Sequence, residues 1–294
     1  KIDDLQDFSK SNKIKSLGLC DTSNLCGALE FAEKISKVGT QPVIGTQINF
    51  KYGDCIGLLP LFALNEEGYK RIIKLSSISF LENDELSDPH VDFKDLLDDN
   101  TGVAVFSGTI FGLFGELYNK GKFSEILDLY KNLKLNFGDR FYIEIQRHND
   151  QNESGFEKFN LNKSLELEIP IIATNEVFYL DKDMHEAHDA LICIGHKTYV
   201  NDKSRIRLSN QHYYKNNSEM TELFADLPEA LENNYNFPLR CNFRPLFSNP
   251  ILPNISSEKG GNADDVLKKD SLHGLRIKFD KIFGIKANEL DKDN

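Results

Sequence analysis

Polar residues able to bind a metal ion or a phosphate group directly follow several short apolar segments of the chain. Carboxylate, imidazole and amide groups are ligands of divalent metals, and in α/β barrels the reacting groups lie at the carboxyl ends of the strands. If each segment is a strand, these residues meet at one edge of a sheet. Hydrolase centres with zinc or manganese usually need several His residues, and only one segment is followed by His, so the set is incomplete. The residues are Asp21 and Thr22 after 16–20, Gln47 after 43–46, His148 after 141–146, and Asn175 and Glu176 after 170–174.

Each candidate also has an ordinary structural interpretation. Asp21 precedes a helical pattern, which favours a helix-capping role over a role in a site. His148 lies in a polar loop, where a solvent-exposed His is commoner than a ligand, although its place at a strand end raises the case for a ligand. Asn175 is typical of a residue that holds a turn. His185 and His188 are three apart on a predicted helix and could bind a metal together, but ordinary surface His residues are the favoured interpretation.

The elements that must position these residues follow a repeating pattern. Short apolar runs alternate with stretches of helical periodicity, which is typical of βα units around a parallel sheet. The acidic stretch 82–99 interrupts this rhythm and is expected to be a surface excursion. Strands are predicted at 16–20, 43–50, 56–64, 102–107, 141–146 and 170–174. Helices are predicted from a cap at Asn24 to about 39, and at 66–79, 113–119, 123–135, 156–167, 184–194, 219–224, 229–240 and 264–283.

The composition changes after the last βα unit. Residues 245–262 hold three of the nine Pro together with Ser and paired Gly, which is typical of an extended linker. We therefore expect a barrel domain over 1–247, a linker over 248–263 and the start of a following region over 264–294.

Length, charge and Cys content exclude several classes of protein. With 294 residues, 40% hydrophobic and 28% charged, the chain is an ordinary globular protein, and it has no run of about 20 apolar residues for a membrane helix. The net charge of −11 disfavours unaided binding to DNA. Five Cys without a C-x-x-C spacing indicate reduced thiols and a cytoplasmic location, and Cys193 reads as a core residue. Phosphate-binding P-loop, dinucleotide-binding and G-x-S-x-G patterns are missing from the sequence.

Several segments match the motifs of a known family. Residues 21–27 (DTSNLCG), Glu30-Phe31 and 42–47 (PVIGTQ) resemble the early motifs of PHP domains, the polymerase and histidinol phosphatase family. Residues 172–195 (IATNEVFYLDKDMHEAHDALICIG) resemble a block found in the PHP domain of the bacterial replicative DNA polymerase III alpha subunits. The resemblance covers almost the whole chain in order, and it continues at 222–231, 240–242 and 250–253.

The resemblance implies a fold of the α/β class, a distorted barrel of about seven βα units at the amino end of a larger polymerase. The family's first strand, with its His-x-His motif and the Asp after it, is expected to lie upstream of this chain. A short helical extension follows the barrel.

The same resemblance implies a degenerate metal site. Where the family's second motif has His, this chain has Thr22; where the third has Glu, it has Gln47; and the late Asp-x-His reads Glu176-Val177-Phe178. Only His148 and Glu176 are left of the family's ligands, because a Thr hydroxyl is a weak neutral ligand and Phe has no lone pair. We expect no metal and no catalytic residue at this site. Its members would be Asp21, Thr22, Gln47, His148, Asn175, Glu176 and Phe178.

By resemblance, the parent protein is a DNA-directed DNA polymerase, a nucleotidyltransferase that uses Mg²⁺ elsewhere in its chain for DNA replication. This region would then serve as a scaffold and as the dock for the proofreading exonuclease subunit and other replicase subunits. DNA would be contacted through other domains, and no membrane would be involved. The alternative is an active metal-dependent PHP phosphoesterase or 3′–5′ exonuclease. A free-standing α/β-barrel ligand-binding protein is disfavoured by the polymerase-specific blocks.

Overall fold

The computed structural model describes residues 1–83, 87–250 and 262–283. The chain divides into two compact units, Lys1–Leu246 and Phe247–Asn294. All strands found among these residues, and the candidate site, belong to the first unit.

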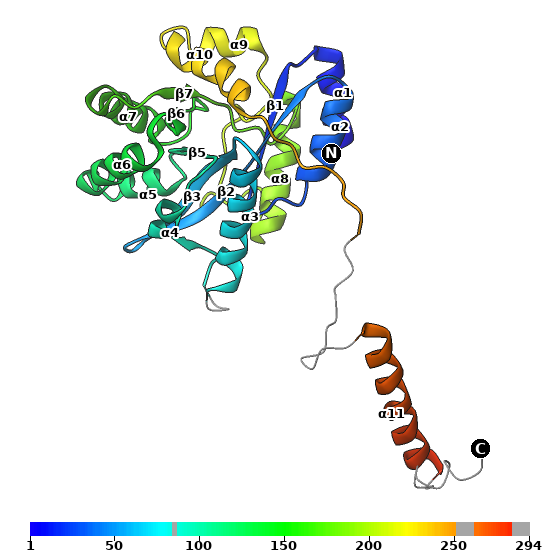
Figure 1. Cartoon of the computed structure of the whole chain (residues 1–294). Helices are drawn as coiled ribbons and strands as arrows, with labels where there is room; N and C mark the ends of the chain where they lie inside the picture. Colours follow the sequence, from blue (N-terminus) through cyan, green and yellow to red (C-terminus); the bar gives the residue numbers. More distant parts are fainter. Residues whose placement is uncertain (84–86, 251–261, 284–294) are drawn as a thin grey trace. The chain divides into compact units, whose positions relative to one another are not determined.

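The first unit is built on a curled, mixed sheet of seven strands with helices packed around it (Figure 1). The order is β1-β2-β3-β5-β6-β7, and β4 pairs with β2. β3 runs antiparallel to both β2 and β5, while all other pairs are parallel. The curled half-barrel confirms the predicted α/β fold class. The strands are β1 Ser16–Thr22, β2 Gln41–Tyr52, β3 Cys55–Ala63, β4 Val91–Asp92, β5 Val103–Phe106, β6 Phe141–Ile145 and β7 Ile171–Ala173.

Eleven helices are found among the described residues. The helix predicted at 113–119 is confirmed at both ends as α5, whereas α1, which lies ahead of the first strand, was not predicted. The helices are α1 Ile2–Asn12, α2 Ala28–Lys37, α3 Glu66–Leu81, α4 Phe93–Asp98, α5 Leu113–Asn119, α6 Phe123–Phe137, α7 Glu153–Leu167, α8 His185–His196, α9 Asn217–Leu223, α10 Pro228–Asn236 and α11 Ala263–Phe283.

Burial of both sheet faces explains the long apolar runs. Every residue of β5 and β6 is buried, as is typical of parallel strands covered by helices on one side and by the barrel interior on the other. The largest core cluster joins β2, β3, β5, β6 and β7 to α3, α5, α6 and α7. The strand ends that carry the candidate site are therefore fixed by a continuous core.

The expected pattern of βα units around a parallel sheet does not hold at β3. Gly53, with φ of 60°, and Asp54 separate β2 from β3, and Tyr52 pairs with Cys55 across this two-residue turn. So short a connection joins antiparallel neighbours, since a parallel crossover needs a dozen residues or more.

Two local predictions were also wrong. Asn24 does not cap α2: its side-chain oxygen accepts from the Cys26 amide in a local turn, and Gly27 is the N-cap residue. The stretch 82–99 is not simply a surface excursion, because Val91, Phe93 and Leu96 are buried and β4 pairs with β2.

The second unit contains α11, which agrees closely with the helix predicted at 264–283. The predicted linker includes residues 251–261, which lie outside the described residues. Among the helices described, none combines the length and the apolar character that crossing a membrane requires.

Candidate functional site

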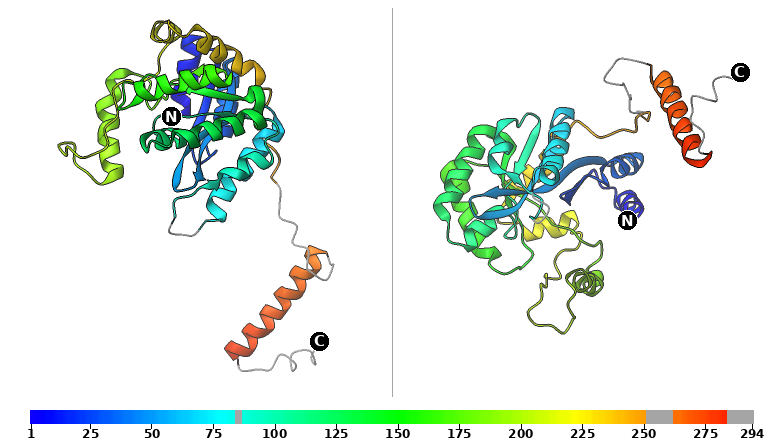
Figure 2. Two further views of the ribbon diagram at one scale, coloured as in Figure 1. Left: turned by 90° about the vertical axis from the view of Figure 1, so that its left-hand side faces the viewer. Right: turned by 90° about the horizontal axis from the view of Figure 1, so that it is seen from below.

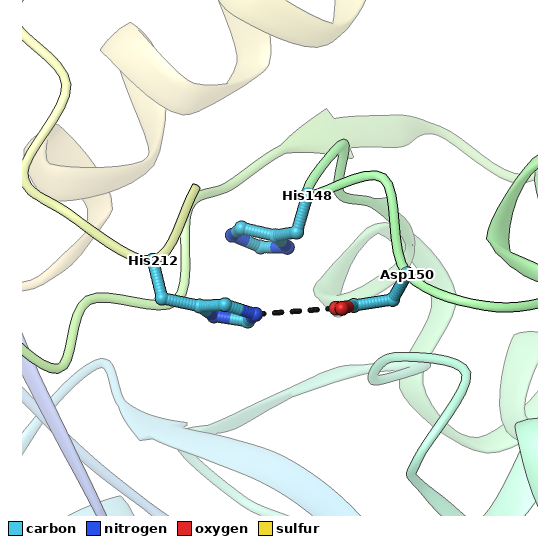
Figure 3. Close-up of side chains that lie close together, drawn as sticks. All are labelled: His148, Asp150 and His212. Carbon is cyan, nitrogen blue, oxygen red and sulfur yellow. Dashed lines mark hydrogen bonds and ion pairs between the residues drawn. The ribbon is translucent and has the colours of Figure 1, made fainter. Parts of the chain in front are cut away.

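A cluster of polar side chains lies beyond the carboxyl ends of β6 and β7. His148 and Asp150 follow β6, Asn175 follows β7, and His212 comes from the segment between α8 and α9. Figure 3 shows His148 and His212 face to face, with Asp150 beside the His212 ring. Three elements far apart in the sequence thus supply one site.

His148 is buried, with only 1% of its surface exposed, so the expectation of an exposed His was wrong. Its backbone amide donates to both carboxylate oxygens of Glu153, each 2.9 Å away, at the start of α7. Its ring nitrogen Nδ1 lies 3.5 Å from Glu153 Oε1, and Nε2 lies 3.1 Å from Asn175 Oδ1. The first turn of α7 and the end of β7 therefore hold the ring from both sides.

The orientation of Asn175 assigns the proton on His148. Asn175 Nδ2 donates to the Tyr213 carbonyl at 2.8 Å, and Lys215 Nζ, which can only donate, lies 3.1 Å from Asn175 Oδ1. Asn175 Oδ1 is therefore an acceptor, and His148 Nε2 must carry a hydrogen to bond with it. Lys215 is only 7% exposed, and burial lowers its pKa. The buried Lys215 side chain thus helps to fix the orientation of the Asn175 amide.

His212 is the main site residue that the sequence did not predict. Its ring stacks on His148 with centroids 4.1 Å apart and planes within 4°. His212 Nε2 lies 3.1 Å from Asp150 Oδ2, while the buried Nδ1 has no hydrogen-bond partner within residues 1–83, 87–250 and 262–283 and lies 3.7 Å from Glu176 Oε2. Although burial acts in the opposite direction, the hydrogen bond and charge of His212 hold the pKa of Asp150 below its ordinary value.

Backbone pairing brings His212 to the site. The Phe178 amide donates to the His212 carbonyl at 3.0 Å, and Tyr179 forms an isolated bridge with Tyr213. His212 follows no apolar run, so a search of strand ends cannot find it. The sequence marks His212 only as a His residue within a polar stretch.

His148, Asp150 and His212 could hold a metal ion, since one ligand atom from each lies within 4.8 Å of the others. A metal bound to an imidazole lies near the ring plane, along the nitrogen lone pair. The two rings are parallel and stacked, so their planes do not meet at one ion. His148 Nε2 also donates to Asn175, which leaves Nδ1 as its only free lone pair. Binding through both imidazoles would therefore require one ring to turn.

The predicted residues on β1 and β2 lie next to each other on adjacent strands. Thr22 pairs with Gln47 in the register, and Gln47 Nε2 lies 3.3 Å from Thr22 Oγ1. Asp21 does not cap α2, because that helix has no side-chain cap. Burial raises the pKa of the Asp21 carboxyl. Burial and then the negative charges of Glu144, Asp21 and Glu176 raise the pKa of the Cys20 thiol. Carboxylates from β1, β6 and the end of β7 therefore all act on Cys20.

Phe178, His185 and His188 form an aromatic edge to the site. Phe178 stacks on His188 with centroids 5.0 Å apart and also contacts His212 at 5.2 Å. His185 Nε2 instead lies 3.2 Å from the Leu208 carbonyl. Burial, followed by the charges of His212 and His185, lowers the pKa of His188. Cys193 is buried in the core, as predicted.

Comparison with known proteins places this fold in a family. The family model described as "PHP domain" matches residues 1–148, half of the chain, and this match ends at His148. The chain belongs to the PHP domain family. This confirms the family on which the sequence resemblance rested.

Curated relatives of this PHP chain are named DNA polymerase III subunit alpha. The relative from Rickettsia conorii is 37% identical over 275 residues, covering 93% of this chain and 23% of the relative. Those from Caulobacter vibrioides and Borreliella burgdorferi are 32% and 33% identical over 95% of the chain, which is 25% and 26% of their own length. The chain thus spans about a quarter of the length of the relatives it matches.

Proposed function

We propose that this chain is the PHP region of a bacterial replicative DNA polymerase, equivalent to the DNA polymerase III alpha subunit. The observation that carries the proposal is the match of 32–37% identity over nearly all of the chain to proteins of that name. Nucleotidyl transfer with Mg²⁺ would then belong to other parts of the parent protein.

Within that role, we propose that the PHP site is degenerate and binds no resident metal. By the sequence resemblance, Thr22, Gln47 and Phe178 stand where the family has metal ligands; Thr and Gln offer only neutral oxygens, and Phe has no lone pair. Two features of the geometry support this proposal. The Nε2 proton of His148 is committed to Asn175, and a buried Lys215 ammonium, which repels cations, contacts the same amide.

Elemental analysis of the purified chain after exposure to Zn²⁺ or Mn²⁺ tests this proposal. We expect less than a stoichiometric amount of metal and no release of phosphate from a chromogenic phosphomonoester. Two or three tightly bound ions per chain, with phosphatase activity that a chelator abolishes, would reject it.

A second candidate is a single metal ion held by His148, Asp150 and His212, favoured by the closeness of their ligand atoms. It predicts saturable binding of one Zn²⁺ by calorimetry. Asp150→Asn and His212→Gln would each weaken that binding at least about tenfold, since each removes a ligand. His185→Gln, on α8, is the matched control and should bind as the wild type does. Weak binding that none of the three substitutions changes would exclude this candidate.

We further propose that the fold serves as a scaffold for protein partners in the replicase, the proofreading exonuclease subunit first among them. A chain of net charge −11 repels phosphates and is better suited to contact proteins than DNA. Fluorescence anisotropy at physiological salt should show binding to the cognate exonuclease subunit and none to single- or double-stranded DNA. Micromolar binding to DNA without binding to the exonuclease would move the assignment to a nucleic-acid role.

A further inference from the structure

We propose that Lys215 supplies a tethered ammonium ion that ties the carboxyl ends of β6 and β7 to the segment before α9, as a bound metal ion ties loops together in other sites. The inference deepens the proposed degenerate site, on which it rests, by naming the cation that organises it. Lys215 is a positioning residue, because it acts on His148 through Asn175.

Lys215 lies where a long excursion of the chain returns to the barrel. Between β7 and α9 the chain leaves the sheet, and α8 and the segment that follows it stand out from the first unit (Figure 2). The return segment, residues 211–216, brings His212 into the site and ends at Asn216, the N-cap residue of α9. The position of the return segment therefore decides whether His212 reaches the site.

The Lys215 ammonium contacts three groups at the base of this excursion. Its Nζ donates to the side-chain oxygen of Asn175 at 3.1 Å and to the backbone carbonyl of Gln211. The same nitrogen lies 4.6 Å from the centre of the Tyr213 ring, within the range of a cation–π contact. An ammonium has only donors to offer, so two oxygens and an aromatic face suit it. These contacts join the end of β7 to the return segment.

The charge of Lys215 is buried without a direct counter-ion. Lys215 is 7% exposed, and among the residues that the structure describes no carboxylate forms an ion pair with it. Burial lowers the pKa of Lys215, and the negative charges of Glu219 and Glu153 oppose this effect from a longer distance. A buried charge is costly unless polar groups replace the water around it, which the two oxygens and the ring do here. The same positive charge repels a metal ion nearby.

One oxygen of Asn175 serves both Lys215 and His148. Lys215 Nζ and His148 Nε2 each lie 3.1 Å from Asn175 Oδ1. Asn175 Nδ2 donates to the Tyr213 carbonyl at 2.8 Å, so the amide is held at both of its polar atoms. At Nε2 the His148 ring therefore donates a hydrogen, whereas a metal ligand would offer a lone pair. Holding Asn175 thus fixes the direction in which His148 donates.

Chemical rescue of the full chain tests the inference. Lys215→Ala deletes the fragment that n-propylammonium reproduces, and 1-propanol has the same length without the charge. We expect propylammonium to raise the melting temperature of Lys215→Ala, relative to the wild type in the same buffer, by about 3 °C or more. 1-Propanol, and NaCl at the same ionic strength, should give no comparable rise. If Lys215→Ala does not fold alone, its refolded fraction in propylammonium and in 1-propanol gives the same comparison.

Two further variants assign the rescue to the Lys215 position. Lys182→Ala is the matched control, because Lys182 Nζ lies 5.7 Å from the centre of the same Tyr213 ring but its side chain is exposed. It should gain nothing from propylammonium. Lys215→Met fills the space without an ammonium and should also gain nothing.

The His148 ring gives a readout that a general loss of packing would not restore. With isotopically labelled histidine, nuclear magnetic resonance should show a hydrogen on Nε2 in the wild type, a changed His148 signal in Lys215→Ala, and its return with propylammonium. Absence of rescue, equal rescue by 1-propanol, or an equal rise in Lys182→Ala would overturn the inference. A wild type that holds stoichiometric metal would reject the degenerate site, and rescue of Lys215→Ala would then still support the tie made by the ammonium.

Discussion

Glu144 is a buried carboxyl that has no cationic partner in the part of the chain that the structure describes, and it links stability to pH. It is 6% exposed on β6; its Oε1 accepts from Gln146 at 3.0 Å and from Thr174, while Oε2 has no hydrogen-bond partner among the described residues. Burial raises its pKa to about 7, and the hydrogen bonds only partly oppose this. The folded state therefore retains a proton that the unfolded chain loses near pH 4.5.

Glu144→Gln should remove this linkage. Between about pH 4.5 and 7 the folded wild type binds more protons than the unfolded chain, so its stability falls as pH rises. The shift corresponds to a loss of up to about 3 kcal/mol, which the neutral Gln avoids while it can still accept from Thr174. Urea unfolding at pH 5 and pH 8 measures the difference. The variant should gain stability relative to wild type at pH 8 only; an equal difference at both pH values would contradict the assignment.

Arg147 provides a second residue-scale prediction. Its guanidinium bonds Glu157 on α7, Asp226 and the carbonyl of Leu223, and it lies 4.9 Å from the centre of the Phe224 ring. Arg147→Met leaves Glu157, whose side chain is only 16% exposed, without a counter-charge, and should cost about 3 kcal/mol in chemical denaturation. Lys37→Met breaks an exposed pair with Glu33 on α2 and serves as the control, with a loss below about 0.5 kcal/mol. Similar losses in both variants would show that Arg147 does not hold these segments together.

At the scale of elements, the sequence predicted the positions of the strands better than their parallel or antiparallel directions. Apolar runs mark all six longer strands; every residue of β5 and β6 is buried, whereas β1 has only partly buried and exposed residues. Such a run carries no direction, so the antiparallel β3 could be read only from the Gly53-Asp54 turn. The strand-end rule found His148, Asn175 and Glu176, whose places depend on β6 and β7. It could not find His212, because that residue reaches the site through loop pairing that only the folded chain shows.

The contact between α3 and the start of β5 gives an element-scale prediction. A Cβ added at Gly68 would lie 1.9 Å from the carbonyl oxygen of Gly102, so the two backbones meet without room for a side chain. Gly68→Ala must push α3 away from β5 and should destabilise the fold by about 3 kcal/mol or more. Gly195→Ala on α8, where no other described residue would lie within 4 Å of the added Cβ, should be neutral or stabilising by up to about 1 kcal/mol. Denaturant midpoints of the two variants would disprove the close-contact explanation if they moved together.

At the scale of the whole molecule, the three core clusters lie entirely within the first compact unit. Phe237 and Cys241 are the core residues nearest the carboxyl end of the described chain, and they form a cluster with Val43 and Tyr142. Gln41 on β2 donates to the carbonyls of Pro238 and Cys241 at 2.7 and 2.8 Å. The segment after α10 is thus a structural part of the barrel, and the fold is complete only when the chain reaches it.

Two truncated chains test whether the barrel needs α10 and the segment that follows it. A chain of residues 1–246 keeps every core cluster, and it should unfold cooperatively with a midpoint within about 2 °C of the full chain. A chain of residues 1–226 loses α10 and with it Ala230, Phe237 and Cys241, which are at most 5% exposed. Removing these buried side chains and leaving Gln41 without its acceptors should lower stability by several kcal/mol. Scanning calorimetry of the three chains measures these stabilities. If the chain of residues 1–226 unfolds like the full chain, α10 and the turn after it are dispensable and the barrel ends earlier in the sequence.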